Sequence, residues 1–364
     1  MTSTTLITTL AFGLGLTFGA LTTATRFCTM GAVADIVSMN DWSRMRMWAL
    51  AILVAMLGTQ AMSAAGLIDL SKTFYTSTNL RWASHIVGGL MFGIGMPLAS
   101  GCGARVLTRL GGGNLKSLVV LVFFGLSAYM ALRGIFGVWR STWLDPMSIN
   151  LPATQDLGAL AAALWGMTSN AAVALASLVV SLPLAVFIFR RGYPGHGVTL
   201  GGAGVGLCVL AGWWISGHLG YVAEHPDTLQ EAFIATDSGR MESLSFAAPV
   251  AYSLELLMLW SDASRTLSFG VAAALGVITG AALHALATKQ FRLESFAGHE
   301  DLARHLIGAM LMGAGGVTAL GCTIGQGVSG VSTLALGSII TLAAILLGCA
   351  LMMKFDEWRL MREA

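Results

Sequence analysis

The amino-acid sequence predicts an all-α polytopic membrane protein with an internally repeated chain. Two observations carry this prediction. Charged residues make up only 10% of the chain and hydrophobic residues make up 55%, whereas about 25% of a soluble globular domain is charged. In addition, a long apolar stretch that starts at His85 recurs without a gap from His305.

The composition excludes several classes of protein. Too few charges are present to cover the water-facing surface of a soluble enzyme. The net charge is +2 and Lys and Arg form no basic run, so the stripe that neutralises nucleic-acid phosphates is absent. The high apolar content excludes an intrinsically disordered chain. The class that remains is a protein whose apolar surface lies in the lipid bilayer.

Apolar stretches cover most of the chain. A spanning helix needs about 20 mostly apolar residues, and segments near this length leave little room for soluble domains. The candidate stretches are 4–24, 47–67, 84–100, 115–135, 157–189, 197–216, 244–260, 266–288, 305–320 and 333–353.

The repeat divides the chain into two halves. HIVGGLMFGIGMPLASGCG from His85 matches HLIGAMLMGAGGVTALGCT from His305, including the His and the Gly-Cys dipeptide. We predict an N-terminal half over 1–192 and a C-terminal half over 193–364, together forming a single transmembrane domain. Duplicated halves are typical of membrane transporters, whose substrate sites lie near the repeat interface.

A polar window at 217–243 interrupts the second half. A weaker echo of the N-terminal stretch places this window between two matched elements, so it is an insertion. We expect an extramembrane loop or a short surface helix. A metal site formed by His218, Glu224 and His225 is a weaker alternative, and we predict no metal or cofactor for the chain.

Three cysteines lie in Gly-rich interruptions of apolar stretches. Cys102 stands between Gly101 and Gly103, Cys322 follows Gly321, and Cys28 interrupts the first apolar stretch. A short apolar helix that ends in Gly-rich backbone predicts a broken or re-entrant helix. Such backbone is tolerated at membrane depth only where it faces protein or lines a cavity.

Other residues near these motifs have two interpretations. Arg26 either extends to the membrane interface or supplies positive potential beside Cys28. Gln326 is a candidate amide donor to a bound ion. We expect Cys208 and Cys349 to be core residues, and the repeated histidines to be helix-entry residues.

The chemistry of such a path favours a soft anion. Helix N-termini and backbone N–H groups attract anions. Thiols are weak donors and polarizable acceptors, so they match a terminal sulfur better than a hard oxyanion. Fixed dipoles hold a dianion without the tight binding that a full ion pair would give.

These motifs resemble those of the YeeE/YedE family, also called the sulfur-transport domain family. The segments that carry the resemblance are Arg26-Phe27-Cys28, Gly101-Cys102-Gly103-Ala104-Arg105 and Gly321-Cys322-Thr323-Ile324-Gly325-Gln326-Gly327. The resemblance implies an inner-membrane, multi-pass permease for thiosulfate, which is not an enzyme. The implied fold has two inverted-repeat halves, about nine transmembrane helices and re-entrant helix-loop elements that meet at the centre.

The resemblance also implies a mechanism and a partner. Cys28, Cys102 and Cys322 would relay the ion by S–H hydrogen bonds along the central path, and a small cytosolic sulfurtransferase-like protein would receive it. The alternatives are a membrane thiol enzyme, either a persulfide-forming sulfurtransferase or a disulfide oxidoreductase, transport of another sulfur or selenium compound, and a non-transporting scaffold. The chain has no CxxC pair, which argues against the oxidoreductase.

Overall fold

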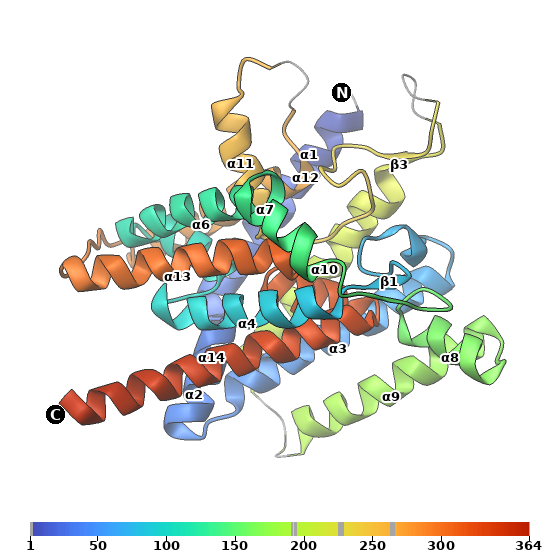
Figure 1. Ribbon diagram of the computed structural model, residues 1–364, viewed down its shortest axis with the longest axis horizontal. Coiled ribbons are helices and arrows are strands. Elements are labelled where there is room, and N and C mark those ends of the chain that lie inside the picture. The colour runs from blue at the N-terminus through green and yellow to red at the C-terminus, as the bar shows by residue number, and fades with distance from the viewer. Residues whose placement is uncertain (1–2, 191, 193–194, 225–228, 263–265, 364) are drawn as a thin grey trace.

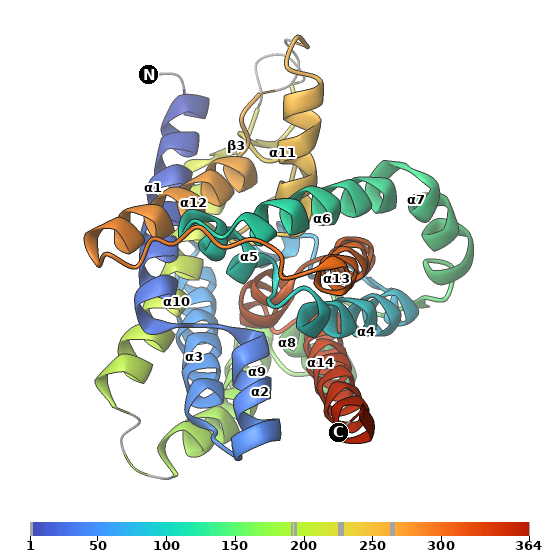
Figure 2. The same cartoon turned by 90° about the vertical axis from the view of Figure 1, so that its left-hand side faces the viewer.

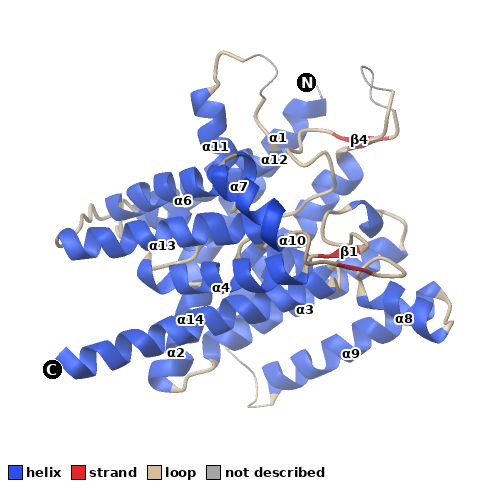
Figure 3. Cartoon of the chain, in the orientation of Figure 1, coloured by secondary structure: helices blue, strands red, loops and turns tan. Residues whose placement is uncertain are grey.

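The computed structural model describes residues 3–363 except 191, 193–194, 225–228 and 263–265. Helices make up most of this part of the chain (Figures 1 and 3). Two short antiparallel pairs are its only named strands: β1 (Asn79–Leu80) pairs with β2 (Ile149–Asn150), and β3 (Tyr221–Val222) pairs with β4 (Ala232–Phe233). The predicted all-α class is confirmed.

The helices follow one another with short connections. In the first half they are α1 (Ser3–Thr25), α2 (Thr29–Met39), α3 (Ser43–Ala64), η1 (Leu70–Lys72), α4 (Trp82–Leu98), α5 (Gly103–Gly111), α6 (Leu115–Arg133), α7 (Ile135–Trp139), η2 (Arg140–Leu144), α8 (Leu157–Trp165) and α9 (Ser169–Phe189). In the second half they are α10 (His196–Trp214), η3 (Ile215–Leu219), α11 (Ala248–Met258), α12 (Phe269–Ala287), α13 (His299–Thr318), η4 (Gly325–Gly330) and α14 (Leu336–Glu363).

Eight helical segments of the described chain are long and apolar enough to cross a membrane, against about nine expected. The chain is therefore a multi-pass membrane protein. Two predicted stretches, 244–260 and 305–320, match none of these eight segments, since 305–320 lies in α13, which is not among them, and a third stretch, 157–189, matches only in its second part. The stretch 157–189 is two helices, α8 and α9, because Gly166 takes a left-handed conformation between them. The stretch 244–260 contains only the 11-residue α11.

The repeated helices α4 and α13 cross through glycines that the sequence match aligns with each other. A Cβ atom on Gly88 would lie 2.7 Å from the Gly315 carbonyl oxygen, and one on Gly95 would lie 2.6 Å from the Gly308 carbonyl oxygen. Glycine is needed here because no side chain fits between the two backbones. The contacts exchange partners, as two elements related by a two-fold axis would.

The surrounding helices pack in the same exchanged pattern (Figure 2). α1 packs on α12, and α10 packs on α3. Likewise α6 packs on α13, and α4 packs on α14. Helices before residue 192 therefore pair with helices after it. The boundary near residue 192 stays a prediction.

The polar window 217–243 folds back over the first half. Its hairpin, β3 and β4, is held to η1 by a salt bridge of 2.6 Å between Lys72 and Glu231. Met241 pairs with Thr73 in an isolated bridge. The described part of the window therefore packs against the segment at Lys72 and Thr73, and apart from its short strands and the end of η3 it has little regular secondary structure.

The crossing of α4 and α13 predicts a specific stability effect. Gly88→Ala places a Cβ atom 2.5 Å from the backbone nitrogen of Ala319, and such overpacking costs about 1–3 kcal/mol. The matched control is Gly13→Ala, because nothing lies within 4 Å of that position and Ala is the better helix former. Thermal unfolding in detergent should lower the midpoint for Gly88→Ala alone. An equal midpoint for the two variants would contradict the close crossing.

Candidate functional site

Each of the three cysteines lies at a joint between a long helix and a shorter helical segment. Cys28 separates α1 from α2, Cys102 separates α4 from α5, and Cys322 separates α13 from the segment that continues into η4. With 11 and 9 residues, α2 and α5 are only about 16 and 14 Å long, too short to cross the bilayer alone. The interrupted helices expected at these motifs are present.

The backbone makes the same turn before each cysteine. The residue two positions earlier is left-handed in all three copies, and the next amide bonds back five residues, which is the Schellman end of a helix. The left-handed residues are Arg26, Ser100 and Leu320, with φ of 54°, 58° and 62°. The hydrogen bonds run from Phe27 N to Thr22 O (3.1 Å), Gly101 N to Met96 O (2.9 Å) and Gly321 N to Gly316 O (2.7 Å).

The glycines at these joints serve packing rather than backbone freedom. None of Gly101, Gly103 and Gly321 has a positive φ. A Cβ atom on Gly101 would lie 2.9 Å from Cγ of Arg105, and one on Gly321 would lie 3.0 Å from Cγ of Gln326. Gly101 and Gly321 therefore leave room for side chains of the helical turn that follows.

The first two cysteines form a pair at the starts of two helices. Cys28 is the N-cap of α2, and its Sγ accepts a hydrogen bond from the backbone N–H of Gly31 at 3.4 Å. Cys102 is the N-cap of α5, and its thiol interacts with the Cys28 thiol. Both thiols thus lie at the positive ends of helices, which attract anions.

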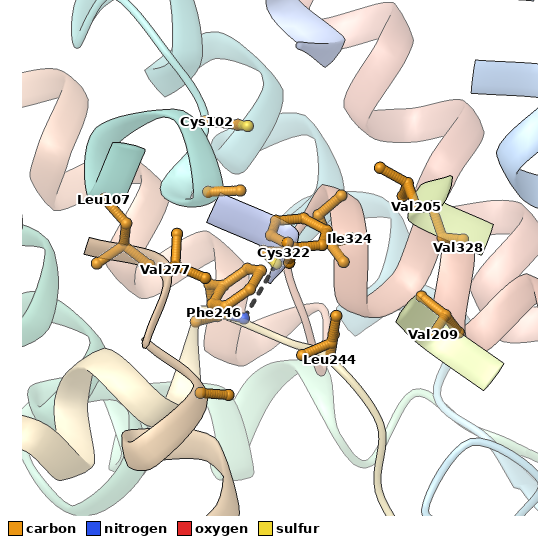
Figure 4. Close-up of a cluster of buried hydrophobic side chains, with 14 of the residues drawn as sticks. Cys102, Leu107, Val205, Val209, Leu244, Phe246, Val277, Cys322, Ile324 and Val328 are labelled. Atoms are coloured by element: carbon orange, nitrogen blue, oxygen red, sulfur yellow. Dashed lines mark hydrogen bonds between the residues drawn. The ribbon is translucent and has the colours of Figure 1, made fainter. Parts of the chain in front are cut away.

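Cys322 lies in the same buried cluster as Cys102, with Phe246 and Ile324 around it (Figure 4). Its Sγ accepts hydrogen bonds from Gly325 N at 3.4 Å and from Phe246 N at 3.3 Å. Phe246 directly precedes the N-cap of α11, Ala247. The Cys322 thiol is fully buried and is surrounded by N–H donors.

Several buried polar atoms around the cysteines lack a hydrogen-bond partner. The hydroxyls of Thr29 and Thr323 interact with the Cys102 thiol, and neither has an oxygen or nitrogen partner. The Tyr75 hydroxyl and the Trp48 indole nitrogen are also buried and unpartnered. Each such group costs about 1–3 kcal/mol when left unpaired. These hydroxyl and indole groups can donate hydrogen bonds to a bound polar ligand.

Tyr75 was not among the residues that the sequence predicted for the site. It follows η1 in a loop, and the motifs at the cysteines give no signal for it. Burial first, and then the neighbouring Cys322 and Glu242, raise the pKa of its hydroxyl well above the usual range. The hydroxyl therefore keeps its proton and can donate a hydrogen bond to a nearby acceptor.

Two cavities flank the cysteines. The one at Cys28 and Cys102 holds only about 10 Å³ and is closed by Phe18 and Ile324, which is at the lower limit for a single water molecule. The other has a volume of about 240 Å³ and reaches Gly321, next to Cys322. We call this second cavity the vestibule. The two cavities are lined by different residues.

The charges near the cysteine pair differ from those expected. Arg26 is exposed and is not among the residues lining the cavity at Cys28 and Cys102. Asp35 pairs with Arg44 at 2.6 Å. Arg105, from the Gly-Cys-Gly-Ala-Arg motif, lines that cavity.

The side-chain amide of Gln326 already donates a hydrogen bond within the protein. Its Nε2 donates to the carbonyl oxygen of Ala319 at 2.7 Å, and its Oε1 has no partner. The side chain therefore braces the end of α13 just before Cys322. Its role toward a bound ion stays a prediction.

The repeated histidines are not helix-entry residues. His85 and His305 are buried inside α4 and α13. His85 Nδ1 lies 2.7 Å from Thr341 Oγ1, whereas His305 Nδ1 lies 2.7 Å from the carbonyl oxygen of Asp301. These unlike partners give them structural roles.

The described residues contain no group of His, Cys, Asp or Glu able to hold a metal ion. Of the alternative site, His218 bonds the Leu67 carbonyl oxygen at 3.1 Å, and His225 lies outside the described residues. As expected, Cys349 is buried in the core, while Cys208 is half-buried against it.

The chain matches known proteins over nearly its whole length. The family described as "Sulphur transport" matches residues 24–351. This chain belongs to the sulphur-transport family. A protein of Spirochaeta thermophila named thiosulfate transporter TsuA is 26% identical over 344 residues, which cover 92% of this chain and 94% of that protein. The thiosulfate transporter TsuA of Escherichia coli is 27% identical over 318 residues, which cover 83% and 81%.

Family membership confirms the resemblance carried by the three cysteine motifs, all of which lie inside the matched range. It makes the chain a transport protein rather than an enzyme. The sequence and the fold agree on this point, since the chain is multi-pass and its candidate site lies at interrupted helices.

The left-handed residue before each cysteine predicts an effect on stability. In Ser100→Gly, glycine adopts this conformation without the strain of about 1–2 kcal/mol that a side chain brings. We expect a higher unfolding midpoint, equivalent to about 0.5 kcal/mol after the added unfolded-state entropy. The same change at Ser181, in the middle of α9, should lower the unfolding midpoint, because glycine in a helix interior reduces the free energy of unfolding by about 0.5–1 kcal/mol. Equal shifts at the two positions would contradict the strained turn.

Proposed function

We propose that this protein carries thiosulfate across the membrane through a central path lined by Cys28, Cys102 and Cys322. The observation that carries the proposal is the threefold arrangement of a cysteine at the start of a helix inside the protein. Two relatives of known name, both thiosulfate transporters, support thiosulfate as the ion.

Helix starts supply the positive potential that an anion needs inside a membrane. Burying a dianion is very costly without compensation. Here N–H groups converge on the Sγ atoms of Cys28 and Cys322, and the unpartnered hydroxyls of Thr29 and Thr323 lie beside Cys102. An entering anion gains these donors in exchange for its hydration shell.

The thiols select for sulfur. An S–H group is a weak donor and a polarizable partner, so it interacts well with the terminal sulfur of thiosulfate and poorly with a strongly hydrated sulfate oxygen. No cation lines the small cavity apart from Arg105. The ion is thus bound weakly enough to move on, which conduction requires.

In this mechanism the ion passes between the thiols as the two sides open in turn. The cavity at Cys28 and Cys102 admits at most one water, and Cys322 is fully buried. Movement of the half-helices α2 and α5, or of the loop at Phe246, opens one side at a time. The closed conformation prevents a continuous leak of ions.

We further propose an inner-membrane location, as the family resemblance implies. The same resemblance suggests that a small cytosolic sulfurtransferase-like protein receives the ion after transport. Other sulfur or selenium anions with a soft terminal atom would fit the same donors, so competition assays should include them.

Replacement of the cysteines tests the proposal directly. Cys28→Ala, Cys102→Ala and Cys322→Ala should each lower uptake of labelled thiosulfate into proteoliposomes at least about tenfold, as loss of one charge-stabilising hydrogen bond does. Cys208→Ala and Cys349→Ala serve as matched controls and should keep uptake within about twofold, because neither thiol lies at an interrupted helix.

The amount of folded protein must be equal in all five variants, as measured by size-exclusion chromatography. Unchanged uptake in both the Cys102 and the Cys322 variants would refute the thiol path. Absence of uptake by the wild-type chain, with the protein folded, would refute transport of thiosulfate by this chain alone.

A further inference from the structure

The inserted window 217–243 brings an acidic residue, Glu242, to the vestibule that leads to Cys322. Residues that line this cavity come from the end of the window, from α11 and from the end of α13. Gly321 is one of them, so the vestibule reaches the residue before Cys322. The window therefore contributes directly to one entrance of the path proposed above.

Glu242 is held in place by its backbone while its carboxyl group remains incompletely bonded. Ser216 bridges to the backbone of Glu242, accepting from its N–H at 3.2 Å and donating to its carbonyl oxygen. Ser238 Oγ donates to Oε2 at 3.2 Å. The other oxygen, Oε1, is shielded from solvent and has no hydrogen-bond partner.

No positive charge compensates this carboxyl group. Arg140 also lines the vestibule, but its Nε is 3.2 Å from Asp145. Arg240 donates to the carbonyl oxygen of Thr73 at 3.4 Å. Among the described residues, Glu242 forms no ion pair. The charged or titratable groups that face it are Asp237, Arg140, Arg240, Tyr252 and Tyr75.

Burial, and then the neighbouring Asp237, raise the pKa of Glu242 to about 8, while the hydrogen bond from Ser238 opposes this shift. Below this pH the carboxyl group is neutral and carries an O–H donor. Above it the carboxylate adds a second negative charge next to Asp237. A dianion in the vestibule is then repelled at short range.

We propose that Glu242 is a protonation switch at the entrance to Cys322, where the anion passes while the carboxyl group is neutral and is repelled while it is ionised. This inference rests on the proposed transport of thiosulfate. The step is a proton equilibrium with water, and no bond to the ion forms or breaks. It also gives the insertion a function, since the insertion supplies both Asp237 and Glu242.

Uptake measured at several pH values tests this switch. Proteoliposomes are prepared with the same pH inside and outside, so that no proton gradient acts on the ion. Thiosulfate stays a dianion throughout the range, and the initial rate of labelled thiosulfate uptake is measured between pH 6.5 and 9.5. For the wild-type chain we expect the rate to fall about tenfold from pH 7 to pH 9, following ionisation of a group of this pKa.

Two variants separate Glu242 from other titrating groups. Glu242→Gln keeps a neutral side chain of the same size, so its uptake should change less than about twofold over this range. Glu231→Gln is the matched control from the same insertion, because Glu231 pairs with Lys72 at the exposed surface. It should keep the wild-type pH profile.

The outcomes distinguish the two proposals. A wild-type rate that does not fall between pH 7 and pH 9, or a Glu242→Gln rate that falls as steeply as wild type, would overturn the switch while leaving transport intact. If Glu242→Gln fails to fold, the pH profile of thiosulfate uptake by the wild-type chain tests the switch by itself. Folded wild-type protein without uptake at any pH would overturn the transport function itself.

Discussion

The structure depends on ending helices inside the protein without leaving their backbone groups unpaired. In a membrane no water is available to satisfy a broken helix, so every interruption must be bonded internally. The turn before each cysteine solves this for the helix that ends, because the amides of Phe27, Gly101 and Gly321 bond back five residues. The helix that follows then presents its first N–H groups to the interior, where Cys28 and Cys322 accept some of them.

The exchanged packing of the two halves brings these joints together. α4 and α13 approach through paired glycines, and the joints at their ends bring Thr323, the residue after Cys322, beside the Cys102 thiol. A fourth joint lies before α11, where Phe246 and Ala247 occupy the places that Phe27 and Cys28 occupy before α2. This joint has no thiol. Instead, its Phe246 N–H donates to Cys322, and the polar window 217–243 that precedes it contributes Glu242 to the vestibule.

Composition was sufficient to predict the membrane class, and the Gly-rich breaks around the cysteines were sufficient to predict the interrupted helices. The family followed from the resemblance of the three cysteine motifs. Other features depend on tertiary contacts that single-sequence patterns do not contain. Arg26, Ser100 and Leu320 are not residues that favour left-handed turns, so the turn itself could not be predicted. The break at Gly166 was readable, since a glycine followed by Thr168 and Ser169 is a stop signal and then a start signal, but the apolar run around it hid that signal.

The places of Tyr75 and Glu242 could not be predicted for a related reason. Both belong to irregular segments whose paths are set by contacts between the halves, such as the pairing of Thr73 with Met241. Arg26 is a case that the sequence left open, because its position suited either an extension to the membrane interface or a role beside Cys28. Its side chain is exposed, and Arg105 lines the cavity at Cys28 and Cys102 instead.

The central claim is that cysteines at helix starts hold the anion, and locating the ion tests it most directly. Selenosulfate carries a terminal selenium in place of the terminal sulfur, and its anomalous signal marks that atom in crystals of the protein. The account predicts an anomalous peak beside the Sγ atom of Cys28, Cys102 or Cys322, at the N-terminal end of a helical segment. Peaks found only at surface arginines, with none at the three cysteines, would contradict it.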